Sequence, residues 1–305
     1  MNKLSKFFFA IFIFVDIFLL GKILLAGKNI QVLNPKGAIA LQERNTMFTA
    51  IFLMLLVVVP VFILAFYVVK KFHKDNTKAT YDPEWDHNTK LQIFIWAFPL
   101  FIVCLLSILV WNSAHKLDPR NAIASTAKPM VIEVVALRWK WLFIYPEQGI
   151  ASVNYVAFPE KTPVAFVLTA MDTPMNSFWI PQLDGQIYAM SGMITQTHLI
   201  ADETGIYRGE NTEINGTGYS DMTFTVQSFS QNDFANWVAS VKQSPNVLDD
   251  NTFSTLAKPA QDVPIAYYSS TESGLYTKIV TKYMAHPTAG LGESSSNSMQ
   301  NMSGM

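Results

Sequence analysis

The stretch VIEVVALRWKWLFIY, residues 131–145, decides the fold of the C-terminal part of the chain. Its two halves, 131–137 and 139–145, are rich in β-branched and aromatic residues, so each is predicted to form a β-strand. Short strands separated by turn residues at this spacing are typical of an antiparallel sandwich or barrel. Four further runs of the same kind lie at 153–158, 164–170, 196–200 and 222–229.

Helical patterns follow the last predicted strand. Ser230 with an acid three residues later, Asp233, is a helix-capping pattern, and apolar residues follow at helical spacing up to Val241. A weaker helical pattern covers residues 275–284. The tail 287–305 is rich in Ser, Asn, Gly and Met and is predicted to be disordered. Its methionines suggest weak Cu(I) binding, but a solvated tail is the favoured interpretation because the tail holds no Cys or His.

The N-terminal part is strongly apolar. Residues 47–69 and 91–111 carry no charge, and each run can cross a hydrocarbon core of about 30 Å as a helix. Each holds one proline, which membrane helices tolerate. A third run, 7–27, is interrupted by Asp16 and Lys22 and preceded by two lysines. This run is either a cleaved signal or an additional transmembrane helix, and the sequence leaves both open.

Composition narrows the class of protein. Only 15% of the 305 residues are charged, whereas soluble proteins carry about 25%, which favours a membrane protein. The net charge of −1 gives no indication of nucleic-acid binding. Cys104 is the single cysteine, which excludes an internal disulfide and any metal site built from several cysteines.

The orientation follows from the lysines between the two charge-free runs. Positive residues in short loops favour the cytoplasmic side, so residues 112–305 are expected outside the cytoplasmic membrane. The charge balance agrees with this, since residues 1–111 carry +5 and residues 112–305 carry −6. The loop lysines are Lys70, Lys71, Lys74, Lys78 and Lys90.

Four motifs carry a resemblance to a known family. They are RWKW at 138–141, FIYPEQGI at 143–150, MNSFWIP at 175–181 and QIYAM at 186–190. Together with the preceding helices they resemble subunit II of the haem-copper oxidases, and more closely subunit II of the bacterial bo-type ubiquinol oxidases. The likeness covers about residues 31–286.

The resemblance implies a membrane-anchored chain with an all-β cupredoxin-like domain and C-terminal helices. The expected division is a leader or extra helix at 1–27, a transmembrane hairpin at 28–111, a cupredoxin-like domain at 112–229, a helical extension at 230–286 and the tail. It also implies partner subunits I, III and IV in an assembly of the aerobic respiratory chain. That assembly would oxidise ubiquinol, reduce oxygen to water and move protons across the bacterial inner membrane, with the cupredoxin-like domain in the periplasm.

In the cytochrome c branch of the family, subunit II holds a dinuclear copper centre. The family ligands are two cysteines with three residues between them, two histidines, a methionine and a backbone carbonyl. A dinuclear copper centre requires bridging thiolates, and a mononuclear type 1 copper site also requires a thiolate. The single cysteine, Cys104, lies in an apolar run, so neither kind of copper site is expected here. The matching positions are Asn211 and Asn215 for the cysteines, Asn176 and Tyr219 for the histidines, Met222, and the carbonyl of Glu213.

The remaining candidates have structural interpretations. Trp139 and Trp141 match the aromatic region that carries electrons in the copper-bearing relatives, but packing is favoured without copper to serve. The three asparagines are expected to fill the former copper cavity with hydrogen bonds, and Met222 to be a core residue. His198 is interpreted as structural. Many relatives have a glutamate at a proton entry where this chain has Gln92, and an amide cannot carry that proton.

No catalytic centre, cofactor or metal is therefore expected on this chain. None of the apolar runs contains the histidine that a membrane haem normally needs, so haems and copper are expected on subunit I. Two other hypotheses stay open, namely a copper-bearing cytochrome c oxidase subunit and a membrane-tethered sensing module with a cupredoxin-like sandwich. The closeness of the four motifs favours the quinol oxidase.

Overall fold

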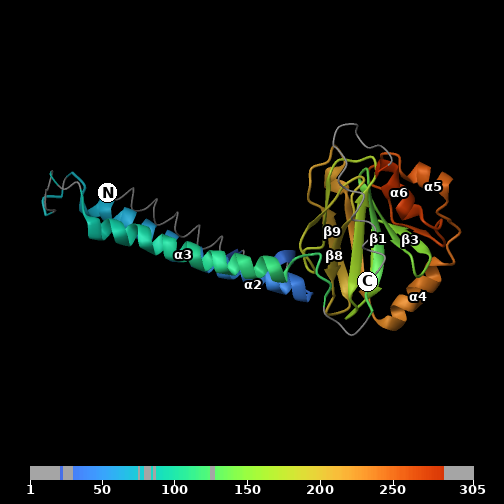
Figure 1. Cartoon of the computed structure of the whole chain (residues 1–305), viewed down its shortest axis with the longest axis horizontal. Coiled ribbons are helices and arrows are strands. Elements are labelled where there is room, and N and C mark those ends of the chain that lie inside the picture. The colour runs from blue at the N-terminus through green and yellow to red at the C-terminus, as the bar shows by residue number, and fades with distance from the viewer. Residues whose placement is uncertain are drawn as a thin grey trace, which may run out of the picture.

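The computed structural model describes residues 21–22, 30–74, 76–78, 84, 87–123 and 128–284. Within these residues a pair of long helices projects from a β-sandwich that is flanked by three short helices (Figure 1). The predictions made for residues 1–20, 23–27 and 287–305, which include most of the leader and the whole tail, lie outside the described residues.

Both charge-free runs lie in helices. A short 3₁₀ turn, η1 (Gln31–Leu33), precedes α2 (Ala38–Lys71), and α3 (Thr89–Lys116) follows. Both long helices are long and apolar enough to cross a membrane, which fits the predicted spans. Both helices extend past the apolar runs into polar residues. At the start of α3, the side chain of Asn88 caps the helix, since its Oδ1 accepts a hydrogen bond from Leu91 N at 3.0 Å.

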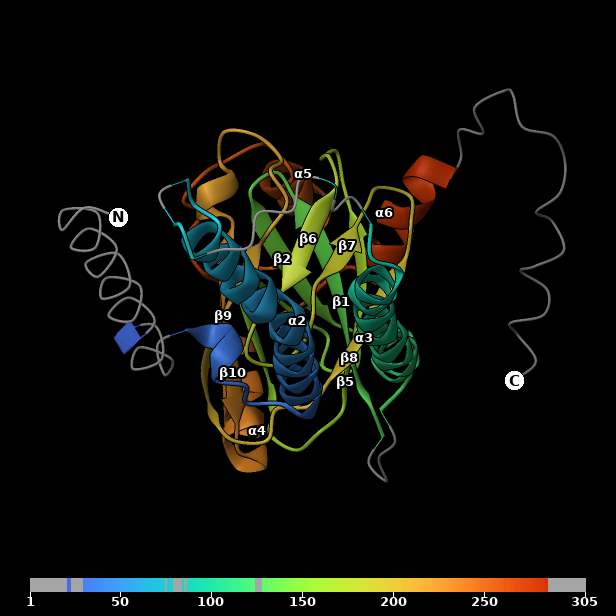
Figure 2. The ribbon, with the colours of Figure 1, turned by 90° about the vertical axis from the view of Figure 1, so that its left-hand side faces the viewer.

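The two helices lie side by side in front of the sandwich (Figure 2). A hydroxyl pair joins them near their sandwich ends, where Thr46 Oγ1 and Ser113 Oγ are 3.3 Å apart. The rest of their surface is largely exposed and apolar, as in Phe62, Phe94 and Trp111. Such a surface suits lipid or a membrane-embedded partner.

The sandwich consists of one six-stranded and one five-stranded sheet. The six-stranded sheet has the order β11-β3-β2-β1-β5-β8, and the five-stranded sheet has the order β4-β10-β9-β6-β7. The strands are β1 (Met130–Leu137), β2 (Lys140–Tyr145), β3 (Ile150–Val153), β4 (Tyr155–Pro159), β5 (Val164–Ala170), β6 (Asn176–Trp179), β7 (Ile187–Ala189), β8 (Thr195–Leu199), β9 (Gly205–Asn211), β10 (Thr223–Phe229) and β11 (Ala266–Tyr268).

Two expectations about the sheets were wrong. The sandwich is not wholly antiparallel, because β1 pairs with β5 and β4 pairs with β10 in parallel. Alternation along a strand reports which faces are buried and not the direction of the neighbouring strand, so the sequence could not reveal this. The predicted strand 153–158 is also divided between the two sheets, because Asn154 has a left-handed backbone (φ 54°) that turns the chain from β3 into β4.

A cluster of aromatic side chains fills the space between the sheets. Phe178 of β6 stacks on Phe224 of β10, with ring centroids 5.0 Å apart and planes at 12°. Trp141 and Phe143 of β2 and Phe166 of β5 surround this pair, each with its ring centroid between 5.2 and 6.3 Å from a ring of the pair. Burial of each such side chain stabilises the fold by about 1.5–3 kcal/mol, so this cluster fixes how the two sheets pack.

The C-terminal helices cover the sandwich. The predicted cap is confirmed, since Ser230 Oγ accepts a hydrogen bond from Asp233 N at 3.2 Å and α4 (Gln231–Val241) follows. The helix predicted at 275–284 is α6 (Leu275–Met284). A further helix, α5 (Asp250–Leu256), escaped prediction because it is short and mostly polar. Apolar residues of α5 and α6 form a second core against the outer face of β1–β3, which buries these strands on both faces.

Candidate functional site

Four of the six positions that match copper ligands are buried close together. Asn176 begins β6, Asn211 ends β9, Asn215 lies in the loop that follows, and Met222 immediately precedes β10. The exposed fraction of these side chains runs from 0% for Asn176 to 8% for Asn215. The β6–β9 pairing and the return of the chain into β10 hold them together. The sequence-based grouping of these residues therefore corresponds to one pocket.

Asn215 is the centre of this pocket. Its Nδ2 donates a hydrogen bond to Asn176 Oδ1 at 2.5 Å and lies 3.3 Å from Met222 Sδ. Asn176 Nδ2 in turn donates to the carbonyl of Pro174 at 2.7 Å. The thioether and the two amides are thus engaged with one another, as expected for residues that fill a cavity.

Asn211, the last residue of β9, also forms several hydrogen bonds through its side-chain amide. Its Oδ1 accepts hydrogen bonds from Ser177 N at 2.8 Å and Glu213 N at 3.2 Å. Its Nδ2 donates to the carbonyl oxygen of Glu213 at 2.8 Å. This is the carbonyl that was predicted to match a backbone ligand of copper, and here it accepts a hydrogen bond from an amide.

The side chains in this pocket do not fit a dinuclear copper centre. They offer amide oxygens and one thioether, whereas two bridged copper ions need thiolates. Tyr219 lies in the 3₁₀ turn η2 (Tyr219–Asp221) and is partly buried, and it takes no part in the amide hydrogen bonds around Asn215 in the described residues. Across the described parts of the chain, no group of three or more His, Cys, Asp or Glu side chains is placed to hold a metal ion.

The two tryptophans of the RWKW motif have packing contacts in this structure. Trp139 adopts φ 64° between β1 and β2, and its ring lies against the loop at Gly216 and Gly218. A Cβ atom at position 218 would come within 2.5 Å of Trp139 Cγ, so glycine is needed there. Trp141 is fully buried, with its ring centroid 5.3 Å from that of Phe178. These contacts agree with the packing interpretation, and any role in electron transfer stays untested.

Two other sequence candidates lie away from the pocket. His198 on β8 has Nδ1 2.9 Å from the carbonyl of Pro119, so it ties the sheet to the segment after α3. Gln92 is exposed in the first turn of α3, where its backbone N–H donates to Asn88 O at 2.9 Å. The structure does not bring either residue close to another candidate, and the meaning of the missing carboxylate at position 92 stays a prediction.

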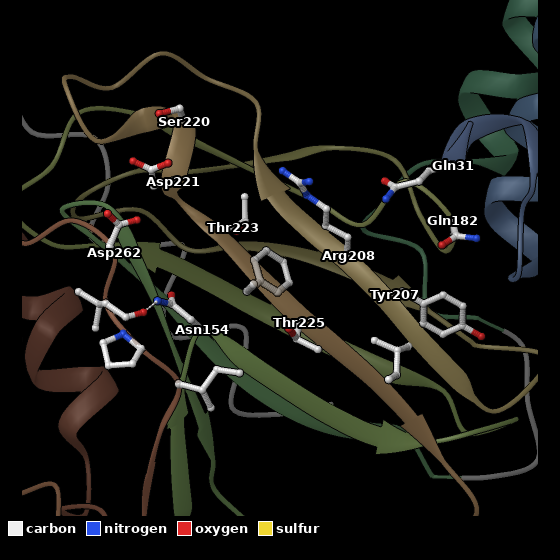
Figure 3. Close-up of a pocket in the computed structure, with 15 residues that line it drawn as sticks. Gln31, Asn154, Gln182, Tyr207, Arg208, Ser220, Asp221, Thr223, Thr225 and Asp262 are labelled. Carbon is white, nitrogen blue, oxygen red and sulfur yellow. Dashed lines mark hydrogen bonds between the residues drawn. The ribbon is translucent and has the colours of Figure 1, made fainter. Parts of the chain in front are cut away.

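A groove of about 800 Å³ runs over the outer face of β9 and β10. In Figure 3, Asp221 and Asp262 lie at one end, Gln31 and Gln182 lie at the other, and Arg208 lies between them. Arg208 is paired with Glu210, with Nε and Oε2 3.3 Å apart, and is largely exposed. The groove is open and brings no nucleophile next to a base, so it carries no chemistry that the sequence overlooked.

Sequence reasoning did miss two carboxyl groups, Glu43 on α2 and Asp184 in the loop after β6. Burial raises the pKa of Asp184 to about 6. The two residues lie far apart in the sequence and in no motif, so no pattern could have paired them. Only the docking of α2 against the sandwich brings them together.

Two family models match the outer part of the chain. Residues 147–229 match the cytochrome c oxidase subunit II periplasmic domain, and residues 242–287 match the COX aromatic rich motif. The cupredoxin-like sandwich with its helical extension is therefore of the oxidase subunit II class.

Two relatives that match most of the chain identify the family within this class. The chain is 47% identical over 264 residues to cytochrome bo(3) ubiquinol oxidase subunit 2 of Pseudomonas putida, which covers 87% of this chain and 84% of the relative. It is 43% identical over 263 residues to ubiquinol oxidase subunit 2 of Acetobacter aceti, which covers 86% of this chain and 85% of that one. The chain belongs to the cytochrome bo(3) ubiquinol oxidase subunit 2 family.

Among solved structures, the chain is similar to the periplasmic domain of subunit II of cytochrome oxidase of Bradyrhizobium japonicum. The sequences are 22% identical, the TM-score is 0.36, and the match covers 39% of this chain and 96% of that one.

Proposed function

We propose that this chain is the copper-free subunit II of a proton-translocating ubiquinol oxidase of the aerobic respiratory chain. Its role is assembly and structure beside a haem-bearing subunit I, with no catalytic centre of its own. The observation that carries the proposal is the hydrogen bond from Asn215 to Asn176 beside Met222, in the pocket where copper-bearing relatives hold their metal.

The electron route follows from the chemistry of this pocket. Amides and a thioether have no accessible redox change, so the sandwich cannot accept an electron from cytochrome c. Ubiquinol dissolves in the bilayer and reaches a membrane-embedded subunit directly. The haems and the copper that reduce oxygen then belong to subunit I, and subunits III and IV complete the assembly.

The proposed location is the bacterial inner membrane, with the charge-free runs 47–69 of α2 and 91–111 of α3 as spans and the sandwich in the periplasm. The lysines of the α2–α3 loop support this orientation. A labelling experiment tests it in a Cys104→Ser background, with Lys78→Cys in the loop and Ser220→Cys on the exposed η2 turn. A membrane-impermeant thiol reagent should label the variant at position 220 in intact spheroplasts and the variant at 78 only after permeabilisation. The opposite pattern would refute the orientation.

The function is tested on the intact complex, purified in detergent through a tag on this chain. We expect oxygen consumption with ubiquinol and none with reduced cytochrome c. Metal analysis should find no copper beyond that of the haem-bearing subunit. Two additional copper ions per complex, or turnover with cytochrome c, would overturn the proposal.

A conservative substitution at Trp139 tests whether electrons pass through the sandwich. Trp139→Phe keeps an aromatic ring next to Gly218, loses the indole atoms that lie near Gly216, and raises the barrier to electron transfer through the ring. We expect unchanged turnover with ubiquinol, since the route bypasses the sandwich. A large loss of turnover in a fully assembled complex would contradict this route.

A further inference from the structure

The start of α2 is fastened to the sandwich by backbone contacts. Lys36 N donates to the carbonyl of Gln182 at 2.6 Å, and Asp202 N donates to the carbonyl of Lys36 at 2.9 Å. Gly37 packs so closely that a Cβ atom there would lie 2.6 Å from Ile200 O. The first turns of α2 therefore lie against the loops that follow β6 and β8.

Two carboxyl groups meet at this junction. Asp184 is buried, with Oδ1 accepting a hydrogen bond from Gly185 N at 2.8 Å and Oδ2 accepting one from the hydroxyl of Thr197 on β8. Glu43, two turns into α2 and before the charge-free run 47–69, places Oε1 on Gly185, where a Cβ atom would overlap it. The absence of a side chain at position 185 is what lets Glu43 approach Asp184.

No cation balances this pair in the described part of the chain. Arg44 donates from Nη1 to Leu33 O at 3.4 Å, and Lys36 is ion-paired with the exposed Glu203. His198, next to Thr197 on β8, has Nδ1 directed to Pro119 O. Across the junction on α3, His115 Nδ1 lies 2.8 Å from Trp111 O, and the neighbouring Lys116 forms no ion pair with any residue that the structure describes. None of these groups forms an ion pair with Glu43 or Asp184 in the described residues.

A pair made of the buried Asp184 and the partly buried Glu43, with no cation beside it, favours retention of a proton, because two nearby negative charges shielded from water repel each other. Burial raises the pKa of Asp184 to about 6, and burial together with the nearby Asp184 raises the pKa of Glu43 to about 7. Both values lie above those of free carboxyl groups, so the docked state binds more protons than the undocked one between about pH 4 and pH 7. The pair thus supports docking at low pH, and this support is lost as the pH rises through 6 to 7.

We propose that Glu43 and Asp184 form a proton-binding site that couples the docking of α2 on the sandwich to the pH of the surrounding medium. With a proton held between them, the carboxyl groups pack over Gly185. When both are ionised, their repulsion loosens the junction between the membrane hairpin and the sandwich. The site is separate from the pocket around Asn215 and requires no metal.

The test measures the thermal release of this subunit from the intact purified complex between pH 5 and pH 8. In the wild type the release temperature should fall as the pH rises. Asp184→Asn should flatten this dependence and should raise the release temperature at pH 8. The amide oxygen can still accept from Gly185 N, the amide N–H can donate to the Thr197 hydroxyl, and the side chain cannot ionise. The matched control Asp202→Asn removes an exposed acid from the same junction and should keep the wild-type slope. Equal slopes in the two variants would refute the proposal.

Two further measurements test the proposal even if the Asp184→Asn variant fails to assemble. Glu43→Gln changes only the partly exposed member of the pair and should also flatten the pH dependence. Infrared spectroscopy of the wild-type complex should show a protonated-carboxyl C=O band at pH 5.5 that is lost by pH 8. Glu43→Gln should remove the part of this band that comes from Glu43 and leave the part from Asp184. A wild-type spectrum identical to that of Glu43→Gln would show that Glu43 holds no proton and would refute the proposal.

Discussion

The side-chain amide of Asn215 contacts two residues, Asn176 and Met222, at positions that are predicted to match copper ligands of the copper-bearing relatives. Asn215→Ala removes the donor to Asn176 Oδ1 and leaves that buried oxygen unpaired. We expect a loss of about 1–3 kcal/mol of stability, seen as a lower midpoint for thermal unfolding of the sandwich in the purified complex.

The control for this prediction is Asn236→Ala, which removes an amide of the same kind from an exposed position on α4. This change should leave the midpoint unaltered, because alanine favours the helix and no buried group loses a partner. Equal effects of the two substitutions would mean that the amides of the pocket do not stabilise the fold.

At the scale of the elements, Asn154 decides where β3 ends and β4 begins. Its Oδ1 accepts from Trp141 N at 2.9 Å, its Nδ2 donates to Val263 O at 2.8 Å, and its backbone is left-handed. Asn154→Ala loses both hydrogen bonds and adds roughly 1–2 kcal/mol of backbone strain. Asn154→Gly loses the hydrogen bonds but suits the backbone. Thermal unfolding should therefore rank wild type above Asn154→Gly and Asn154→Gly above Asn154→Ala, and a reversed order of the two variants would contradict the role of the backbone.

The start of α4 depends on one hydroxyl. Ser230 Oγ accepts from Asp233 N and donates to Asp233 Oδ2 at 2.7 Å, so Ser230→Ala should destabilise the helix by about 1 kcal/mol. Hydrogen–deuterium exchange in the first turn of α4 should accelerate accordingly. Ser254→Ala, an exposed change inside α5, should leave exchange in α4 unchanged. Unaltered exchange in Ser230→Ala would show that packing alone holds the first turn.

At the scale of the whole molecule, α6 is fastened to the sandwich through Asp172. The hydroxyl of Tyr283 donates to Asp172 Oδ1 and accepts from Asp172 N, both at 2.7 Å, and Lys282 Nζ lies 2.8 Å from Asp172 Oδ2. Tyr283→Phe should weaken the attachment of α6 by about 0.5–1.5 kcal/mol and should speed limited proteolysis within α6. Tyr188→Phe changes an exposed tyrosine on β7 and should leave the cleavage rate unchanged. Equal rates in both variants would mean that the apolar face of α6 alone secures it.

Much of the fold could be predicted from local patterns. The charge-free runs 47–69 and 91–111 indicated two helices, because a single segment in an apolar medium can form all its backbone hydrogen bonds internally only as a helix. Alternating and β-branched runs indicated β1, β2, β5, β8 and β10, and the Ser230–Asp233 pattern indicated α4. The short strands β6, β7, β9 and β11 were not predicted as strands, because their pairing partners and not their composition make them extended.

The candidate site was partly predictable for a similar reason. The sequence predicts that Asn176, Asn211, Asn215 and Tyr219 replace thiolate and imidazole ligands, and this stays a prediction that rests on side-chain type alone. Loop geometry decides which of these side chains form hydrogen bonds with one another. Asn215 donates to Asn176, whereas Tyr219 takes no part in these hydrogen bonds. The carboxyl pair at the α2 junction had no sequence signal at all.

The sequence by itself determined which segments suit a membrane and which segments form the main strands, because hydrophobicity and propensity belong to individual residues. The prediction of missing metal ligands likewise rests on the donor chemistry of individual residues. Tertiary structure alone decided the parallel pairing of β1 with β5, the turn at Asn154 and the meeting of Glu43 with Asp184. These features arise from contacts between residues far apart in the chain, whose formation depends on how the whole molecule packs.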